Sequence, residues 1–217
     1  MTPAEIARDL RRLAGEVEKL ASTPPAPPAI VRDVRLPAGH YHPQQYQKDL
    51  VVLHFTAGSS VSGAVNHWQT LAAAVGTAYV LDRAGVLYEI FDPRCWAHHL
   101  GIPGAASENY RHDQRSIGIE IVNVGPLRRF GGALCWWPQT WKAKYCSEDE
   151  RHLYVEKTFR GEMAWATYTD AQYETLGRFL PVLCADHGIP PTLPEPRLRG
   201  ERSEERRVGK ECRSRWS

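Results

Sequence analysis

His54 combines a chemically active side chain with an unusual position in the sequence. It follows the apolar residues 51–53 and precedes a small polar turn at residues 56–58. Such a run is typical of a buried strand, and a strand end holds an imidazole rigidly enough for a metal site. The alternative is a core histidine hydrogen-bonded to the backbone, and the run alone does not decide between the two.

Glu120 is the one charged residue in the apolar run 117–122. Alternation along a strand places Ile119 and Ile121 on one face and Glu120 on the other. Glu120 could be a solvent-facing residue of an edge strand, but Gly118 and Val122 share its face, which is therefore not plainly polar. Burial there would raise the pKa of the carboxyl group and suit it to act as a general base for a metal-bound water.

The segment 96–101 reads Trp-Ala-His-His-Leu-Gly and supplies two further histidines. Adjacent residues of an extended segment point in opposite directions, so one of His98 and His99 is expected at the surface. The chain has no H-E-x-x-H pattern, no G-x-S-x-G nucleophile elbow and no phosphate-binding loop.

The surrounding elements predict an α/β fold, with a mixed central β-sheet flanked by helices. We expect a long helix that begins at Thr169-Asp170 and ends near His187-Gly188, and an irregular, Trp-rich segment over residues 125–160. The other expected elements are strands at 50–55, 78–81, 86–91 and 117–122 and a helix at 61–70.

Residues 1–21 predict an amphipathic helix that begins with the capping box Thr2-Pro3-Ala4-Glu5. Its narrow apolar stripe suits packing back on the main domain or a weak coiled coil. Residues 22–29 form a Pro-rich linker, and residues 30–201 form the main domain.

The tail 202–217 resembles the in-frame translation of a short-read sequencing adapter. We expect it to be an artefact, with the natural C-terminus lying beyond what was read. The tail holds six basic and three acidic residues, so the net charge changes from +2 to −1 without it. The basic balance therefore does not indicate a nucleic-acid partner.

No apolar run is long enough to span a bilayer, and the N-terminus lacks the apolar region of a signal peptide. We therefore expect synthesis in the cytoplasm and no membrane insertion. The five cysteines form no C-x-x-C pair, which argues against a zinc ribbon and a disulfide scaffold.

Five segments occur in an order that resembles a known family. They are VVLHFTAG at 51–58, TAYVLDRAGVLYEI at 77–90, WAHHLG at 96–101, SIGIEIVN at 116–123 and YTDAQYETLGRFLPVL at 168–183. Together they resemble the zinc-dependent N-acetylmuramoyl-L-alanine amidases, which share a fold with peptidoglycan recognition proteins and include phage endolysins. The resemblance covers residues 35–190.

The resemblance implies hydrolysis of the amide between N-acetylmuramic acid and L-alanine in peptidoglycan, by a monomer that acts on the cell wall. By position, His54 matches the first Zn²⁺ ligand and Glu120 matches the catalytic glutamate. His99, Tyr79 and Thr56 are assigned to substrate binding, with Tyr79 in a local pattern that departs from the family's. The missing signal peptide favours a phage lysin.

The family's second and third zinc ligands lie after the long C-terminal helix, and no matching stretch precedes residue 202. We therefore expect a C-terminally truncated amidase that binds zinc weakly and does not turn over. The alternatives are a non-catalytic peptidoglycan-binding module and an unrelated α/β domain.

Overall fold

A computed structural model describes residues 26–101, 106–190 and 192. The expected helix at 1–21 and the tail at 202–217 therefore lie outside the described residues. The described end of the expected linker, residues 26–29, has no regular secondary structure.

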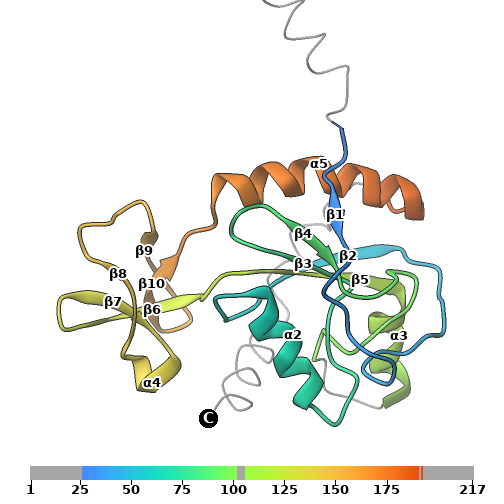
Figure 1. The fold of residues 1–217 in the computed structure, drawn as a ribbon, viewed down its shortest axis with the longest axis horizontal. Coiled ribbons are helices and arrows are strands. Elements are labelled where there is room, and N and C mark those ends of the chain that lie inside the picture. The colour runs from blue at the N-terminus through green and yellow to red at the C-terminus, as the bar shows by residue number, and fades with distance from the viewer. Residues whose placement is uncertain (1–25, 102–105, 191, 193–217) are drawn as a thin grey trace, which may run out of the picture.

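A five-stranded mixed sheet forms the centre of the molecule, with the strand order β1-β4-β3-β5-β2 (Figure 1). β3 and β4 pair antiparallel, whereas the other neighbouring strands pair parallel. This confirms the predicted mixed sheet, and residues 82–85 lie in the turn between β3 and β4. The strands are β1 (Ile30–Val31), β2 (Leu50–Phe55), β3 (Tyr79–Leu81), β4 (Leu87–Glu89) and β5 (Ser116–Ile121).

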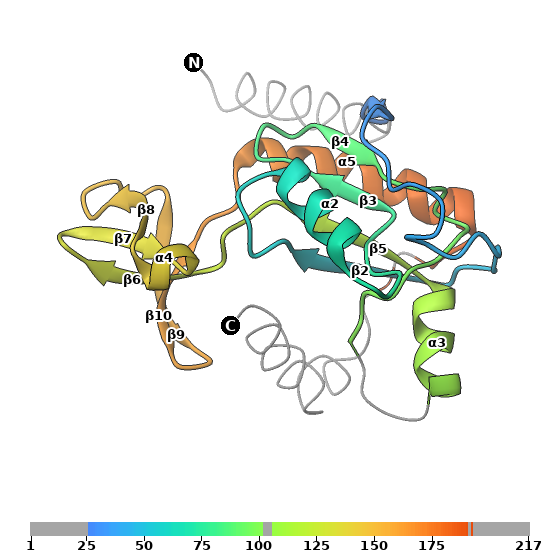
Figure 2. The same cartoon turned by 60° about the horizontal axis from the view of Figure 1, so that its bottom comes forward.

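Helices α2 (Val61–Thr70) and α5 (Asp170–His187) lie on opposite faces of this sheet (Figures 1 and 2). Both start where the sequence predicts, because hydroxyl side chains satisfy backbone N–H groups that have no partner inside the helix. Ser60 accepts from the Gly63 N–H at 3.0 Å, and Thr169 forms a capping box with Gln172.

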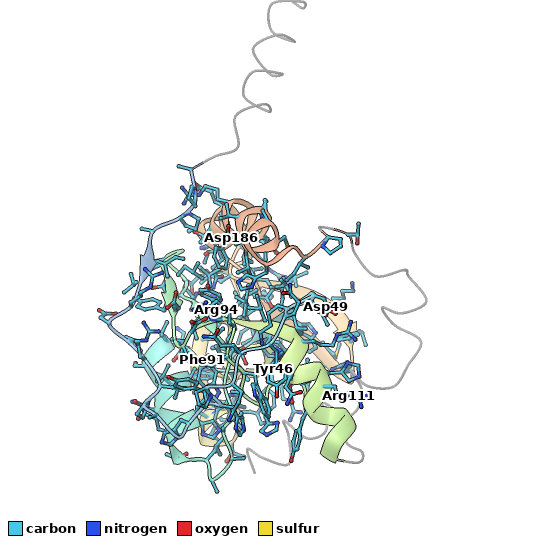
Figure 3. All side chains as sticks on the ribbon, turned by 90° about the vertical axis from the view of Figure 1, so that its right-hand side faces the viewer. Tyr46, Asp49, Phe91, Arg94, Arg111 and Asp186 are labelled. Atoms are coloured by element: carbon cyan, nitrogen blue, oxygen red, sulfur yellow. The ribbon has the colours of Figure 1, made fainter. Side chains whose placement is uncertain are left out.

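A third helix, α3 (Ala106–Arg115), leads directly into β5. Figure 3 looks onto the end of the molecule that carries α3 and shows side chains packed between the elements, with Phe91 labelled among them. Phe91 is 3% exposed and belongs to the main hydrophobic core. None of the described helices is long and apolar enough to cross a membrane.

The segment between β5 and α5 forms a second sheet, so the prediction of an irregular segment over 125–160 was wrong. Its order is β8-β7-β6-β10-β9, antiparallel throughout, and it stands at one end of the central sheet (Figure 1). Its elements are β6 (Pro126–Phe130), β7 (Ala133–Trp136), α4 (Pro138–Trp141), β8 (Ala143–Ser147), β9 (Tyr154–Phe159) and β10 (Glu162–Ala166).

This second sheet has a hydrophobic core of its own, which includes Leu127, Leu134 and Tyr154. The sequence does not predict these strands, because they are short and several of their residues are exposed. In β9 every residue after Tyr154 is exposed, so apolar and polar residues do not alternate with burial. The cysteines of the described residues are free thiols, as the sequence predicts.

Replacing Thr169 with alanine removes the hydroxyl that caps α5 and that also donates to the Arg83 carbonyl oxygen. We expect the free energy of unfolding to fall by about 1 kcal/mol, as is usual for the loss of a helix cap. Urea denaturation of Thr169→Ala measures this change. Thr169→Ser keeps the hydroxyl and should stay near wild type; equal losses in both variants would contradict a capping role.

Candidate active site

His54 and Glu120 lie side by side at the carboxyl ends of β2 and β5. The parallel pairing of these strands places His54 opposite Glu120, and β3 places Val80 on the other side of Glu120. Register partners in a sheet project from the same face. The imidazole and the carboxyl group therefore share one face, while Ile119 and Ile121 point into the core on the other.

The carboxyl group of Glu120 is buried from solvent. Its Oε2 atom is buried and has no hydrogen-bond partner among the described residues. Burial raises the pKa of Glu120 to about 8, because the charged form loses its hydration. This confirms the predicted desolvation and leaves a carboxyl group that exchanges its proton near neutral pH.

His99 lies directly against His54. The His99 Nδ1 and His54 Nε2 atoms are 2.9 Å apart, and the two rings meet edge to face. Burial lowers the pKa of His54 to about 4. Burial, and then the neighbouring His54, lower the pKa of His99 well below its ordinary value. Both imidazoles are therefore neutral at neutral pH.

Gly118 makes the close approach of His99 possible. It lies on β5 between Ser116 and Glu120, on the same face as both. A Cβ atom at this position would lie 3.1 Å from His99 Nδ1 and 2.7 Å from Thr77 Cγ2. This role of Gly118 was not predicted from the sequence, although a glycine inside a strand is a known sign that another group approaches closely.

Asp113 holds the turn that carries His99. Its Oδ1 atom accepts from the backbone N–H groups of His99 and Leu100, each at 3.1 Å. Its Oδ2 atom lies 3.1 Å from His98 Nδ1. The side chain of His98 is 28% exposed and that of His99 is 4% exposed, so the two histidines point in different directions as predicted.

Two other residues expected to bind substrate do not converge on Glu120. The Thr56 hydroxyl group donates to the Gly58 carbonyl oxygen at 3.0 Å and accepts from the Asn123 N–H at 3.2 Å, which joins the end of β2 to the end of β5. Tyr79 lies on the opposite face of the sheet, where its ring packs against Phe179 of α5.

The second sheet contacts the turn that follows His54. The Trp137 indole N–H donates to the Ala57 carbonyl oxygen at 2.6 Å. Ala57 has a φ of 48°, a left-handed conformation that few non-glycine residues adopt. The Trp-rich segment thus reaches the residue three positions after the candidate metal ligand.

A pocket of about 250 Å³ opens between β2 and α5, on the face of the sheet opposite to the Glu120 side chain. Its wall is mainly apolar, and Leu53 and Phe55 at the outer edge of β2 are 47% and 40% exposed. The residues that line it are Leu53, His54, Phe55, Ile121, Tyr168, Gln172, Tyr173 and Leu176.

The described residues do not by themselves fit a zinc site. Zinc in a catalytic site takes three protein ligands and leaves one position open. Within residues 26–101, 106–190 and 192, no group of three or more His, Cys, Asp or Glu side chains is placed to hold a metal ion. His54 is therefore a candidate ligand without a described set around it.

A protein-family model described as N-acetylmuramoyl-L-alanine amidase matches residues 44–200 of the chain. No curated protein sequence matches the chain.

Several solved structures are similar to the chain. The E. coli amidase AmiD, in complex with anhydro-N-acetylmuramic acid-L-Ala-D-gamma-Glu-L-Lys, is 17% identical with a TM-score of 0.41 over 69% of this chain and 48% of AmiD. LysC from Clostridium intestinale is 13% identical with a TM-score of 0.41 over 75% and 78%. Drosophila PGRP-SA is 12% identical with a TM-score of 0.37 over 76% and 76%.

The alignments span about half of several of these proteins. The chain covers 58% of a PlyL mutant, 48% of AmiD and 61% of a mutant endolysin from Bacillus subtilis.

The raised pKa of Glu120 predicts a pH-dependent stability. In the folded chain Glu120 keeps its proton up to about pH 8, whereas the unfolded carboxyl group ionises above about pH 4.5. Between these values the unfolded state binds fewer protons, so raising the pH lowers stability. Glu120→Gln cannot ionise, and its free energy of unfolding should gain on wild type by up to about 1.4 kcal/mol per pH unit.

Urea denaturation of both proteins from pH 5 to pH 8 measures this difference. Glu174 provides a matched control, because its side chain is 73% exposed. Glu174→Gln should track wild type across the range. A constant difference between Glu120→Gln and wild type would contradict the burial of a neutral carboxyl group.

Proposed function

We propose, because this chain belongs to the N-acetylmuramoyl-L-alanine amidase family, that it hydrolyses the amide between the lactyl group of N-acetylmuramic acid and L-alanine in peptidoglycan. The observation that carries the proposal is the in-register pair His54 and Glu120, which lies inside the matched range. By this proposal the chain acts on the cell wall as a monomer.

Glu120 is the proposed general base. Such a base works best when its pKa lies near the operating pH, and burial brings the pKa of Glu120 to about 8. The Oε2 atom is buried and has no described hydrogen-bond partner, so its lone pairs are not used by the protein. Glu120 takes the proton of the attacking water and gives it to the leaving nitrogen, so that the C–N bond yields a carboxylic acid and a free amine.

The substrate-binding role that we propose for His99 is supported by its place beside His54, on the same face as Glu120. Thr56 directly follows β2, the strand that carries His54, and is a second candidate for substrate binding. Tyr79 lies beneath α5, and a role in substrate binding would be indirect, through the packing of that face.

Zinc is the cofactor that the family resemblance implies, and His54 is the residue proposed to bind it. The neutral imidazole of His54 is the form that binds a metal ion. Since the described residues do not complete a ligand set, no step above is assigned to the metal.

A non-catalytic peptidoglycan-binding module is the second candidate function. The observation that favours it is the same incomplete ligand set. The two candidates share a substrate and differ in whether the amide bond is cut, so one experiment separates them.

A muropeptide incubated with the chain and added Zn²⁺ tests the proposal. Release of a stem peptide with a free L-alanine amine, detected by mass spectrometry, would support it and would contradict the expectation from the sequence that this chain does not turn over. Glu120→Gln should lower this rate by at least about 100-fold, the usual contribution of a general base. Glu174→Gln is the matched control and should not change the rate. Binding of the muropeptide without cleavage would establish the second candidate, and neither binding nor cleavage would refute both.

We expect the chain to retain well under one equivalent of zinc after dialysis, and to show no measurable turnover without added metal. The physical reason is that fewer than three described ligands share the ion. Elemental analysis of the dialysed protein measures the content. One tightly held zinc per chain would overturn this expectation, and loss of that zinc in His54→Ala would then identify His54 as a ligand.

A further inference from the structure

The hydrogen bonds around His99 have directions that follow from the number of protons available. Ser116 has one hydroxyl proton. Its Oγ atom lies 2.6 Å from the His112 carbonyl oxygen and 3.5 Å from that of Asp113. A carbonyl group has no proton to give, so Ser116 donates to the backbone and keeps only lone pairs for other partners.

The same Oγ atom lies 2.8 Å from Nε2 of His99. Because the Ser116 proton is already used, His99 must donate from Nε2. The Asp113 carboxylate, 3.9 Å from Nε2, favours a proton at that position as well. In the neutral imidazole of His99 the proton therefore sits on Nε2, and Nδ1 carries the lone pair.

The lone pair on His99 Nδ1 faces Nε2 of His54 at 2.9 Å. Two lone pairs at this distance repel each other, so His54 must donate from Nε2. Neutral His54 then carries its lone pair on Nδ1. One chain of donors thus runs from His54 through His99 and Ser116 to the His112 carbonyl oxygen.

We propose that Ser116 is a positioning residue that fixes the tautomers of His99 and His54, so that neutral His54 carries its proton on Nε2 and its lone pair on Nδ1. This rests on the proposed function and deepens it, because it names the ring nitrogen of His54 that carries the lone pair. The proton positions themselves do not depend on which reaction the chain performs.

The environment makes the arrangement strongly preferred. Ser116 is 3% exposed and the His99 side chain is 4% exposed, so water does not replace a lost partner. If the direction of these hydrogen bonds were reversed, the lone pair of His99 Nε2 would face Ser116. Ser116 would then have to give up its hydrogen bond to the His112 carbonyl oxygen, or Nε2 would have no partner. Loss of one buried hydrogen bond corresponds to a preference of about tenfold or more.

Long-range ¹H–¹⁵N correlation spectra of the histidine rings test the proposal, because the pattern of couplings distinguishes the two tautomers. The full chain is labelled with ¹⁵N, stripped of metal with a chelator and measured at neutral pH. We expect both His54 and His99 to show the Nε2–H tautomer. A His54 ring protonated on Nδ1 would overturn the proposal without any variant.

Ser116→Ala removes the hydroxyl oxygen that accepts from His99 Nε2, and both histidine rings should shift to a mixture of tautomers. Ser116→Thr keeps a hydroxyl group and should restore the wild-type pattern. Ser62→Ala is the matched control, since Ser62 is exposed on α2, and it should change nothing. Unchanged tautomers in Ser116→Ala would refute the role of Ser116. These readouts are independent of catalysis, so failure of the amidase assay would not affect them.

Discussion

The parallel pairing of β2 with β5 is the constraint on which the site depends. It sets His54 opposite Glu120, and the side-chain period of two means that a slip by one residue would exchange Glu120 for an isoleucine on that face. The register is held from the other face, where Ile117, Ile119 and Ile121 are buried in the main core. Apolar packing beneath α5 thus fixes the position of the polar groups above.

The buried ionisable groups of the site differ in how far hydrogen bonds compensate the loss of their hydration. His54 and His99 satisfy each other and pass their hydrogen bonds on to Ser116. Glu120 keeps one oxygen without a described partner, which is costly for stability. His54, His99 and Glu120 all favour their neutral forms at neutral pH. Among these three side chains, a negative charge therefore develops only when Glu120 loses its proton.

The sequence predicts the elements that carry His54 and Glu120 well, because each is a short apolar run with clear ends. It does not predict the contact between His54 and His99, since that depends on the course of a loop fixed by bonds to Asp113. The sequence also does not predict which face of the sheet carries Tyr79, because that face follows from the register between β3 and β5. Short strands with exposed charges hid the second sheet, in which local alternation is weak.

The two sheets differ in how far apart in the sequence their partners lie. In the second sheet β6 and β7, and likewise β9 and β10, are joined by two-residue turns, and β7 and β8 are joined through α4. Only β6 and β10 are far apart in the sequence, with β7, α4, β8 and β9 between them. By contrast, residues 50–55 must find residues 116–121 across two intervening strands and two helices. Closing that long loop costs more chain entropy and slows pairing. We therefore infer that the second sheet forms early in folding, and that the pair bearing the chemistry is among the last parts of the molecule to assemble.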